Sequence, residues 1–289
     1  YVGLSGGFGT ILAGNLTGPT RALGAKFDVN SGATGIGANT ALLAKFSGGS
    51  GAGAFDQRIT NAIAYVSPNL GGFTGVLGYS TGLTVVGTNL TAHESMGVDN
   101  AAQGNTAWTM GLNYETGPIY VGYAYTAVNA AGNGSNLADG ANAAGQNKWD
   151  DHRLGAMYKA GFGQVGVLFD RARIDPTTGS DLKQNTWYLS GKFNVLAKGA
   201  VLAQWGHAGD LKGNNVEKEG ANHYVLGYEH SLSKRTVLKA VYSRIANKDN
   251  AAYDYLYGVS AANSTATNDY FASAGTNVSG FSFGLRHAF

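Results

Sequence analysis

Apolar and polar residues alternate one by one through many segments of the chain. In Thr106–Glu115 every second position is apolar: Trp108, Met110, Leu112 and Tyr114. Because successive side chains of a strand point to opposite faces, this pattern predicts a β-strand with one apolar face. We count about thirteen such strands, of roughly 8–11 residues each. Further clear examples are Ile119–Thr126, Thr186–Asn194, Asn222–Glu229 and Ser279–Phe289.

The connections between the predicted strands alternate between short and long. The short ones are Gly6–Gly9, Ser67–Gly72, Thr116–Pro118, Gly161–Gln164, Val195–Gly199 and Leu232–Lys234. The long ones are Leu16–Gln57, Thr81–Asn105, Ala127–Asp150, Ile174–Gln184, Ala208–Ala221 and Ala246–Thr276. Short turns at one rim and long loops at the other are typical of outer-membrane β-barrels. A soluble β-sandwich would show the same alternation but has no reason to separate the two lengths.

Aromatic residues often end the apolar faces, as at Trp108 with Tyr114 and at Trp187 with Phe193. Trp and Tyr are stable at the lipid–water boundary, so these positions favour a lipid-facing surface. The sequence therefore predicts an all-β fold, a transmembrane antiparallel β-barrel in a bacterial outer membrane. Its short turns would be periplasmic and its long loops extracellular.

Composition narrows the alternatives. Only 13% of residues are charged, there are 45 Gly and no Cys, and the mean hydropathy is −0.11. No run of about 20 apolar residues is present, which excludes a transmembrane helix. The chain begins within a strand-like segment, so we expect no signal peptide in it. The net charge of +2 gives no reason to expect a nucleic-acid partner, and we treat residues 1–289 as one domain.

Four motifs resemble the general porins of Gram-negative bacteria, especially the β-proteobacterial and neisserial type. The resemblance covers the whole chain. It implies a barrel of sixteen strands, with about three strands before Tyr1 that are not present here. An odd number of strands would leave the first and last pointing the same way, so we expect an N-terminally incomplete chain rather than a barrel with a parallel seam. The motifs are YVGLSGGFGT at Tyr1–Thr10, RITNAIAYVSPNLGG at Arg58–Gly72, HSLSKRT at His230–Thr236 and GLRHAF at Gly284–Phe289.

The resemblance also implies partners. We expect a homotrimer whose contact in the family uses N-terminal strands, together with membrane lipid and lipopolysaccharide around the barrel. A C-terminal strand with a final aromatic residue is read in this family by the barrel-assembly machinery. Phe289, with Leu285 and Phe283 on the same face, is the expected assembly signal. The alternative is an ordinary edge strand that happens to end in Phe.

In the family, a long loop folds inward and narrows the lumen, and here that constriction loop would span about residues 17–57. Its charged residues are Arg21, Lys26, Asp28, Lys45 and Asp56. Arg58 matches a wall arginine of the family and, by alternation with Thr60 and Ala62, is expected to face the lumen. Asn15 stands where the family carries another arginine, which weakens that cluster. Further charges expected to face the lumen are Arg153, Lys192, Lys239, Arg286, Glu115 and Glu229.

These charges favour a weak preference for anions, because charged groups in a narrow passage bias which ions enter. Each of them has a simpler alternative as a solvated lumen residue without a selective role. We expect a water-filled channel for passive diffusion of small hydrophilic solutes and ions. A substrate-specific channel is the first alternative, and an outer-membrane barrel enzyme such as a lipase or protease is the second.

Catalytic and metal-binding motifs are missing from the sequence. The six His form no zinc spacing, and no G-x-S-x-G elbow or P-loop occurs. Asp151 and His152 are adjacent on a predicted strand and would point to opposite faces, which makes a catalytic pair improbable. We expect no enzyme activity, no cofactor and no metal.

Overall fold

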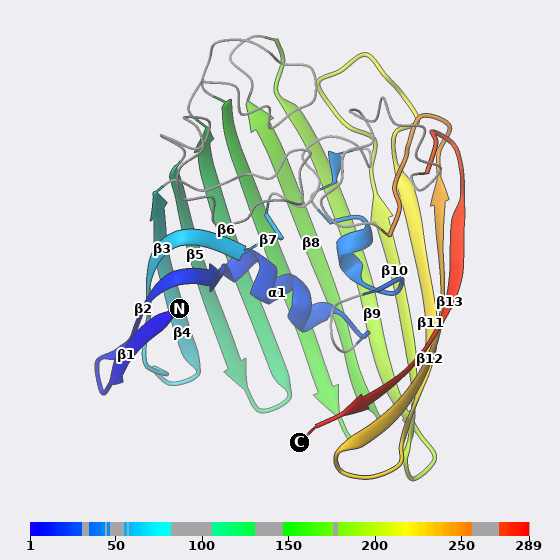
Figure 1. Ribbon diagram of the computed structural model, residues 1–289, viewed down its shortest axis with the longest axis horizontal. Coiled ribbons are helices and arrows are strands. Elements are labelled where there is room, and N and C mark those ends of the chain that lie inside the picture. The colour runs from blue at the N-terminus through cyan, green and yellow to red at the C-terminus, as the bar shows by residue number, and fades with distance from the viewer. Residues whose placement is uncertain are drawn as a thin grey trace.

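A computed structural model describes residues 1–30, 35–43, 45–46, 55–56, 58–81, 106–130, 147–175, 179–255 and 272–288. These residues form one sheet of 13 strands, each antiparallel to its neighbours in sequence (Figure 1). The all-β, antiparallel prediction and the strand count are confirmed. The strands at the two edges of the sheet are β1 and β13.

The first half of the sheet contains β1 (Val2–Gly6), β2 (Gly9–Thr17), β3 (Arg58–Val66), β4 (Phe73–Thr81), β5 (Thr106–Thr116), β6 (Ile119–Ala130) and β7 (Asn147–Ala160). The second half contains β8 (Gly163–Asp175), β9 (Leu182–Val195), β10 (Gly199–Ala208), β11 (Ala221–Ser231), β12 (Thr236–Asn247) and β13 (Val278–His287). Between β2 and β3 lie the helix α1 (Pro19–Phe27) and the short 3₁₀ helix η1 (Asn39–Ala41). None of the helical segments in the described part of the chain is both long and apolar enough to cross a membrane.

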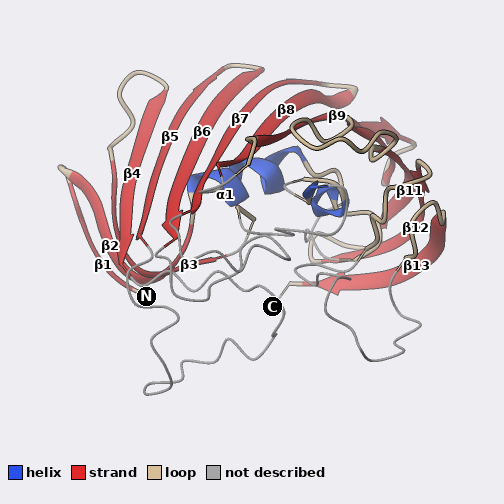
Figure 2. Ribbon diagram, turned by 90° about the horizontal axis from the view of Figure 1, so that it is seen from above, coloured by secondary structure: helices blue, strands red, loops and turns tan. Residues whose placement is uncertain are grey.

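The sheet is strongly curled, and α1 lies inside the curl (Figure 2). We call the side of the sheet that carries α1 the inner face. Along β7, buried residues such as Arg153 alternate with exposed ones such as Leu154, which is 50% exposed. The outer face is apolar and uncovered, with Trp108, Trp187 and Leu189 all about half exposed. Large exposed apolar side chains on every second residue are what a lipid-facing surface requires.

Short turns join the strands at one end of the sheet, which is the lower edge in Figure 1. The β5–β6 turn is Gly117–Pro118 and the β7–β8 turn is Gly161–Phe162. Such tight turns fix the register of the hairpins that they join. In the β7–β8 hairpin, Ala160 pairs with Gly163, which places Arg153 opposite Asp170.

Glycines make room for α1 on the inner face. A Cβ atom added at Gly155 would lie 2.4 Å from the Phe27 ring, and one at Gly122 would lie 2.6 Å from Leu23. A Cβ at Gly111 would lie 2.8 Å from Pro19. Glycine within a strand often marks a place where another element approaches closely. These glycines lie on β5, β6 and β7 and leave a flat surface against which the helix packs.

The apolar side of α1 is buried. Leu23 and Phe27 pack with Tyr120, Met157 and Leu168 from the strands beneath them. A second buried cluster nearer the long connections joins Phe46 and Phe55 of the loop to the wall; its wall members include Ile59, Ala62, Ala107, Val128, Trp149 and Ile174. Burial of such apolar side chains stabilises by about 1.5–3 kcal/mol each. The segment between β2 and β3, called here the inward segment, is therefore packed against the wall in the parts that the structure describes.

A β-bulge in β3 corrects the expected orientation of Arg58. The pairing of β2 with β3 shifts between Gly14 and Leu16, and Asn61 has a positive φ of 47°. As a result Ile59 and Ala62, three residues apart, are both buried and belong to the same cluster. Arg58 is adjacent to Ile59 and is exposed, so alternation from Ala62 assigns it to the wrong face. An extra residue in one strand reverses the alternation beyond it.

Candidate functional site

The inward segment begins with α1, which follows β2 after the single residue Gly18. Gly18 is the N-cap residue, with extended φ and ψ of −67° and 159°, and Pro19 is the first helical residue. Proline is favoured at this position because its missing N–H would have no partner there in any case. Lys26 lies in the last turn, where the helix dipole favours a cation.

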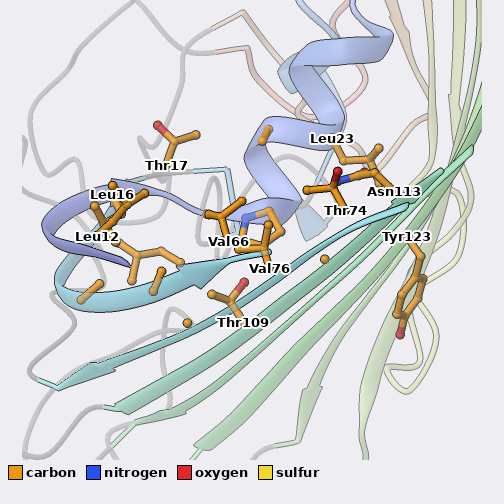
Figure 3. Close-up of a pocket in the computed structure, with 18 of the residues that line it drawn as sticks. Leu12, Leu16, Thr17, Leu23, Val66, Thr74, Val76, Thr109, Asn113 and Tyr123 are labelled. Atoms are coloured by element: carbon orange, nitrogen blue, oxygen red, sulfur yellow. The ribbon is translucent and has the colours of Figure 1, made fainter. Parts of the chain in front are cut away.

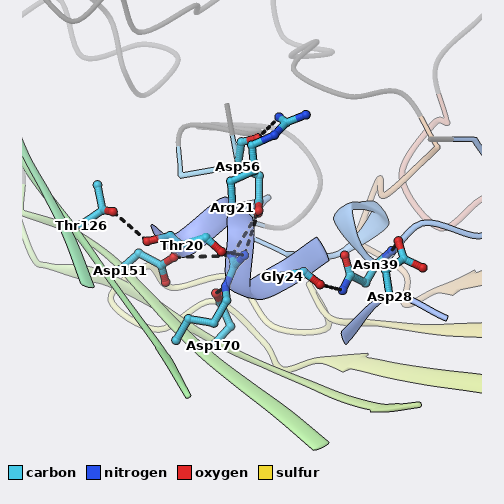
Figure 4. A network of polar contacts seen from close by, with 10 residues as sticks. Thr20, Arg21, Gly24, Asp28, Asn39, Asp56, Thr126, Asp151 and Asp170 are labelled. Atoms are coloured by element: carbon cyan, nitrogen blue, oxygen red, sulfur yellow. Dashed lines mark hydrogen bonds and ion pairs between the residues drawn. The ribbon is translucent and has the colours of Figure 1, made fainter. Parts of the chain in front are cut away.

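A fully buried ionic cluster ties the segment to the wall (Figure 4). Arg153 of β7 donates to both carboxylate oxygens of Asp56, over 2.8 and 3.0 Å. Its Nε donates to the carboxylate of Asp170 on β8 over 2.6 Å, and its Nη2 lies 3.5 Å from the carboxylate of Asp151. All four side chains are at most 1% exposed. We call these four residues the Arg153 cluster.

Further hydrogen bonds surround the Arg153 cluster. Arg153 also donates to the backbone carbonyl of Thr20 in α1, over 3.0 Å. The hydroxyl of Thr20 lies 2.7 Å from that of Thr126 on β6. Arg21 donates to the backbone carbonyl of Asp56. The start of α1 and the end of the loop are thus held at one point on the wall, formed by β6, β7 and β8.

Asp28 follows α1 and holds the loop's own backbone. Its carboxylate accepts hydrogen bonds from the N–H groups of Asn30 and Asn39, over 2.8 and 3.2 Å. Burial raises the pKa of Asp28 to about 6, although these two hydrogen bonds act in the opposite direction. Asp28 is buried, so it contributes to the shape of the loop more directly than to the field in the passage.

Lys45 joins the loop to a different connection. Its ammonium donates to the backbone carbonyl of Asp254 over 2.8 Å and lies 3.5 Å from the Asp254 carboxylate. Burial lowers the pKa of Lys45 to about 8, and the neighbouring carboxylate opposes that shift. The contact links the inward segment to the chain between β12 and β13.

Lys26 and Glu115 face each other across the inner surface. The Lys26 ammonium is 3.0 Å from the Glu115 carboxylate and 3.7 Å from the centre of the Tyr120 ring. Lys159 of β7 approaches the same carboxylate to 3.0 Å. One glutamate therefore lies between two lysines, and all three side chains are at least one-third exposed.

A second such group lies further around the sheet and is called here the Glu229 cluster: Glu229, Lys192 and Lys239. Lys192 of β9 forms an ion pair with Glu229 of β11, and Lys239 of β12 lies 3.9 Å from the same carboxylate. Lys192 is 31% exposed and Lys239 is 18% exposed. Arg286 is exposed and pairs in register with Val237 of β12, two residues from Lys239.

A cavity of about 530 Å³ lies between α1 and the inner face of β2–β5 (Figure 3). Polar groups, among them Thr74, Thr109 and Asn113, line part of it. Lys26 and Glu115 also border it. Most of the remaining lining is apolar: Leu12, Leu16, Pro19, Leu23, Ile59, Ala62, Ala64, Val66 and Val76.

The structure brings the predicted residues together only in part. Asp56 and Arg153 join in one cluster with Asp151 and Asp170. Thr20 and Thr126 lie beside this cluster. The sequence did not predict Asp151, Asp170, Thr20 or Thr126 as site residues. Within the described ranges no group of His, Asp and Glu could hold a metal ion. Phe283 and Leu285 of β13 are 80% and 63% exposed, and Phe289 lies outside the described residues.

Three comparisons with known proteins agree with this architecture. A sequence model described as "Gram-negative porin" matches residues 1–250. Outer membrane porin protein 32 of Delftia acidovorans is 29% identical over all of this chain, which covers 72% of that protein. Major outer membrane protein P.IB of Neisseria lactamica is 26% identical over 82% of this chain and 62% of its own length.

Among solved structures, an anion-selective porin from Comamonas acidovorans is similar to this chain. It has a TM-score of 0.74 and 27% sequence identity. The match covers 99% of this chain and 76% of that one.

Proposed function

Since the chain belongs to the Gram-negative porin family and is an outer-membrane channel protein, we propose that small hydrophilic solutes and ions diffuse passively along its inner face, with a weak preference for anions. The constriction is the segment of residues 17–57, which carries α1. The charges that act on the solute are those at the border of the passage: Lys26, Lys159, Lys192, Lys239, Arg286, Glu115 and Glu229.

The observation that carries the anion preference is the excess of lysine around each of two inner-face glutamates. Glu115 lies between Lys26 and Lys159, and Glu229 lies beside Lys192 and Lys239. Each group has two lysines and one glutamate, which give it a formal net charge of +1. Positive potential in a narrow passage raises the local concentration of anions and lowers that of cations. The similar porin from Comamonas acidovorans, described as anion-selective, supports the same direction.

Planar-bilayer recordings test this proposal. We expect a conductance that is linear in voltage, and a reversal potential in a KCl gradient that has the sign of chloride preference. A reversal potential with the sign of potassium preference would contradict the selectivity but leave the channel intact. A protein that forms no conducting channel would contradict the proposed diffusion itself.

A substrate-specific channel is the second candidate, and the largely apolar lining of the cavity favours it. A lumen wall that carries Leu12, Leu16 and Val66 is less polar than a passage for ions alone requires. A solute-specific channel would show a conductance or flux that saturates as solute concentration rises. A general porin would show flux proportional to concentration over the same range.

The proposal does not include an enzyme activity. The most direct Ser–His contact in the described part of the chain joins Ser243 to His223 over 2.8 Å, and both side chains are fully buried. The other ring nitrogen of His223 faces the hydroxyl of Tyr188 at 3.1 Å. A serine hydrolase needs an accessible nucleophile and, in most cases, an acid behind its histidine, and this arrangement offers neither.

We also propose that the channel works as a homotrimer, on the strength of the family resemblance. Light scattering of the detergent-solubilised protein would measure the mass directly, and a monomer at all concentrations would contradict the proposal. Assembly by the barrel-assembly machinery through Phe283, Leu285 and Phe289 stays a prediction, as does contact with membrane lipid and lipopolysaccharide.

A further inference from the structure

The cavity between α1 and β2–β5 changes from apolar to polar along its wall. Residues that pair in register lie side by side on neighbouring antiparallel strands, so the inner face can be followed row by row. Toward the short turns, two mostly apolar rows are followed by a polar one: Leu12, Ala64, Gly78 and Thr109; then Val66, Val76 and Gly111; then Thr74 and Asn113. Figure 3 shows Leu12 at one end of the cavity and Asn113 at the other.

The polar end of the cavity carries one charge of each sign. Glu115 is the next inner-face residue after Asn113 on β5, and the Lys26 ammonium is 3.0 Å from its carboxylate. Both residues border the cavity, whereas Lys159, the other partner of Glu115, is not among the residues that line it. An ammonium group has three donors, and a carboxylate can accept about four hydrogen bonds. The contact between Lys26 and Glu115 therefore leaves both groups able to bind a ligand.

Two neutral polar groups lie in the row before this charged pair. The side-chain carbonyl of Asn113 accepts a hydrogen bond from the Tyr120 hydroxyl over 2.6 Å, and its amide nitrogen remains able to donate. Neither that nitrogen nor the Thr74 hydroxyl bonds to another group in the described part of the chain. A few polar groups in a largely apolar pocket are what orients a bound small molecule.

From this arrangement we propose that the cavity binds an α-amino acid with a large apolar side chain. The ligand's carboxylate accepts hydrogen bonds from Lys26, its ammonium group donates to Glu115, and its side chain lies along the two apolar rows. The inference rests on the proposed channel and names the solute class that a specific channel of this kind would carry. The cavity volume of about 530 Å³ is within the usual range of small-molecule pockets, about 300–1,000 Å³.

Charge complementarity favours this ligand over simpler ones. A monocarboxylate would be attracted by Lys26 but repelled by Glu115, and for an amine the two effects are reversed. In an α-amino acid the two charged groups are attached to one carbon atom and are therefore adjacent, as the groups of Lys26 and Glu115 are. A zwitterion is thus the headgroup that meets an opposite charge at both residues.

Equilibrium binding to the whole chain in detergent, with radiolabelled leucine as the probe, tests the proposal. Three unlabelled competitors each lack one part of leucine: isocaproate lacks the ammonium group, isoamylamine lacks the carboxylate and glycine lacks the side chain. Each should compete about tenfold more weakly than unlabelled leucine. A hydrogen bond to a charged group, or the burial of an apolar side chain, contributes at least about that much to binding.

A variant of the charged pair tests the placement of the headgroup. Glu115→Gln removes the partner of the ligand's ammonium group and should weaken leucine binding about tenfold. Glu115 is about half exposed, so we expect this variant to fold. Glu229→Gln is the matched control and should bind leucine as the wild-type protein does. Glu229 also lies beside two lysines, but it is not among the residues that line the cavity.

Three results would overturn the assignment. Isocaproate that competes as well as leucine would identify a site for anions, and glycine that competes as well would show that the apolar rows take no part. The third is an equal change, or no change, in the two variants. Bilayer conductance reports on the channel separately. A conducting channel that does not bind leucine contradicts only this site, and a chain that binds leucine without conducting contradicts only the proposed diffusion.

Discussion

The Arg153 cluster and the Glu229 cluster lie on the same inner face but differ in their contact with water. In the Arg153 cluster one arginine meets three aspartates, and every side chain is at most 1% exposed. In the Glu229 cluster one glutamate meets two lysines that remain partly exposed. The first ties the segment between β2 and β3 to the wall, and the second is one of the two groups that we propose contribute charge to the passage. Burial therefore decides what an inward charge does, and the sequence position alone does not.

The largest expected effect follows from breaking the buried cluster. Arg153→Met should lower the free energy of unfolding by about 3–5 kcal/mol, because it leaves Asp56 and Asp170 buried without their cation. Urea unfolding in detergent would measure this change. Arg171→Met, on the adjacent strand but on the outer face, is the control and should change stability far less. Equal losses for both variants would mean that the Arg153 cluster has no special role.

A change of pH should alter the stability of the protein through the buried carboxyl group of Asp28 in the loop. The pKa of Asp28 rises from 3.8 to about 6 on folding, so its contribution to stability is complete below pH 4 and is lost as the pH rises through about 6. Two pKa units correspond to about 3 kcal/mol. The stability of Asp28→Asn relative to wild type should therefore increase between pH 4 and pH 7, as measured by denaturant unfolding at each pH.

The control for that measurement is Asp249→Asn. Asp249 is exposed, and its pKa is lowered by hydrogen bonding to Lys218, so it should not reproduce the upward trend. A pH-independent difference between Asp28→Asn and wild type would contradict the role of burial at Asp28.

The partly exposed cluster should affect selectivity more than stability. Replacing Lys192 and Lys239 together by Gln leaves Glu229 without a cation and should move the reversal potential toward cations. Bilayer recordings in a salt gradient would detect the shift. Lys183→Gln removes a lysine on the outer face and should leave the reversal potential unchanged. The idea fails if both variants behave like wild type.

The smallest effect is expected at Arg58. Since Arg58 and the inner-face residue Ile59 are adjacent, Arg58→Ala should leave the reversal potential unchanged. A shift as large as that of the Lys192 and Lys239 double variant would show that the Arg58 side chain reaches the passage despite the bulge.

Alternation was sufficient to predict the strands, their number and the separation of inner and outer faces for most of the sheet. It failed at β3, because the bulge at Asn61 adds one residue without any visible break in the hydrophobic pattern. The short turn after Ala160 fixes a register that pairs Arg153 with Asp170, so this contact was accessible from sequence in principle.

The contacts made by the loop could not be predicted from the sequence in the same way. Asp56 reaches Arg153 across 97 residues of chain, and Lys45 reaches Asp254 across 209. Neither pair belongs to a hairpin, so no turn sets their alignment. Both depend on where α1 packs, and that is decided by the shape of the wall, which only the folded sheet defines.

The glycines beneath α1 shape the wall, and they therefore affect the width of the opening beside the helix. At Gly155 a single methyl group would collide with the ring of Phe27, and at Gly111 it would meet Pro19. Larger residues at these positions would push the helix away from the wall. The width of the opening on the other side of the helix would then decrease. We therefore expect the largest solute admitted to depend partly on these glycines, which lie behind the helix and out of contact with the solute.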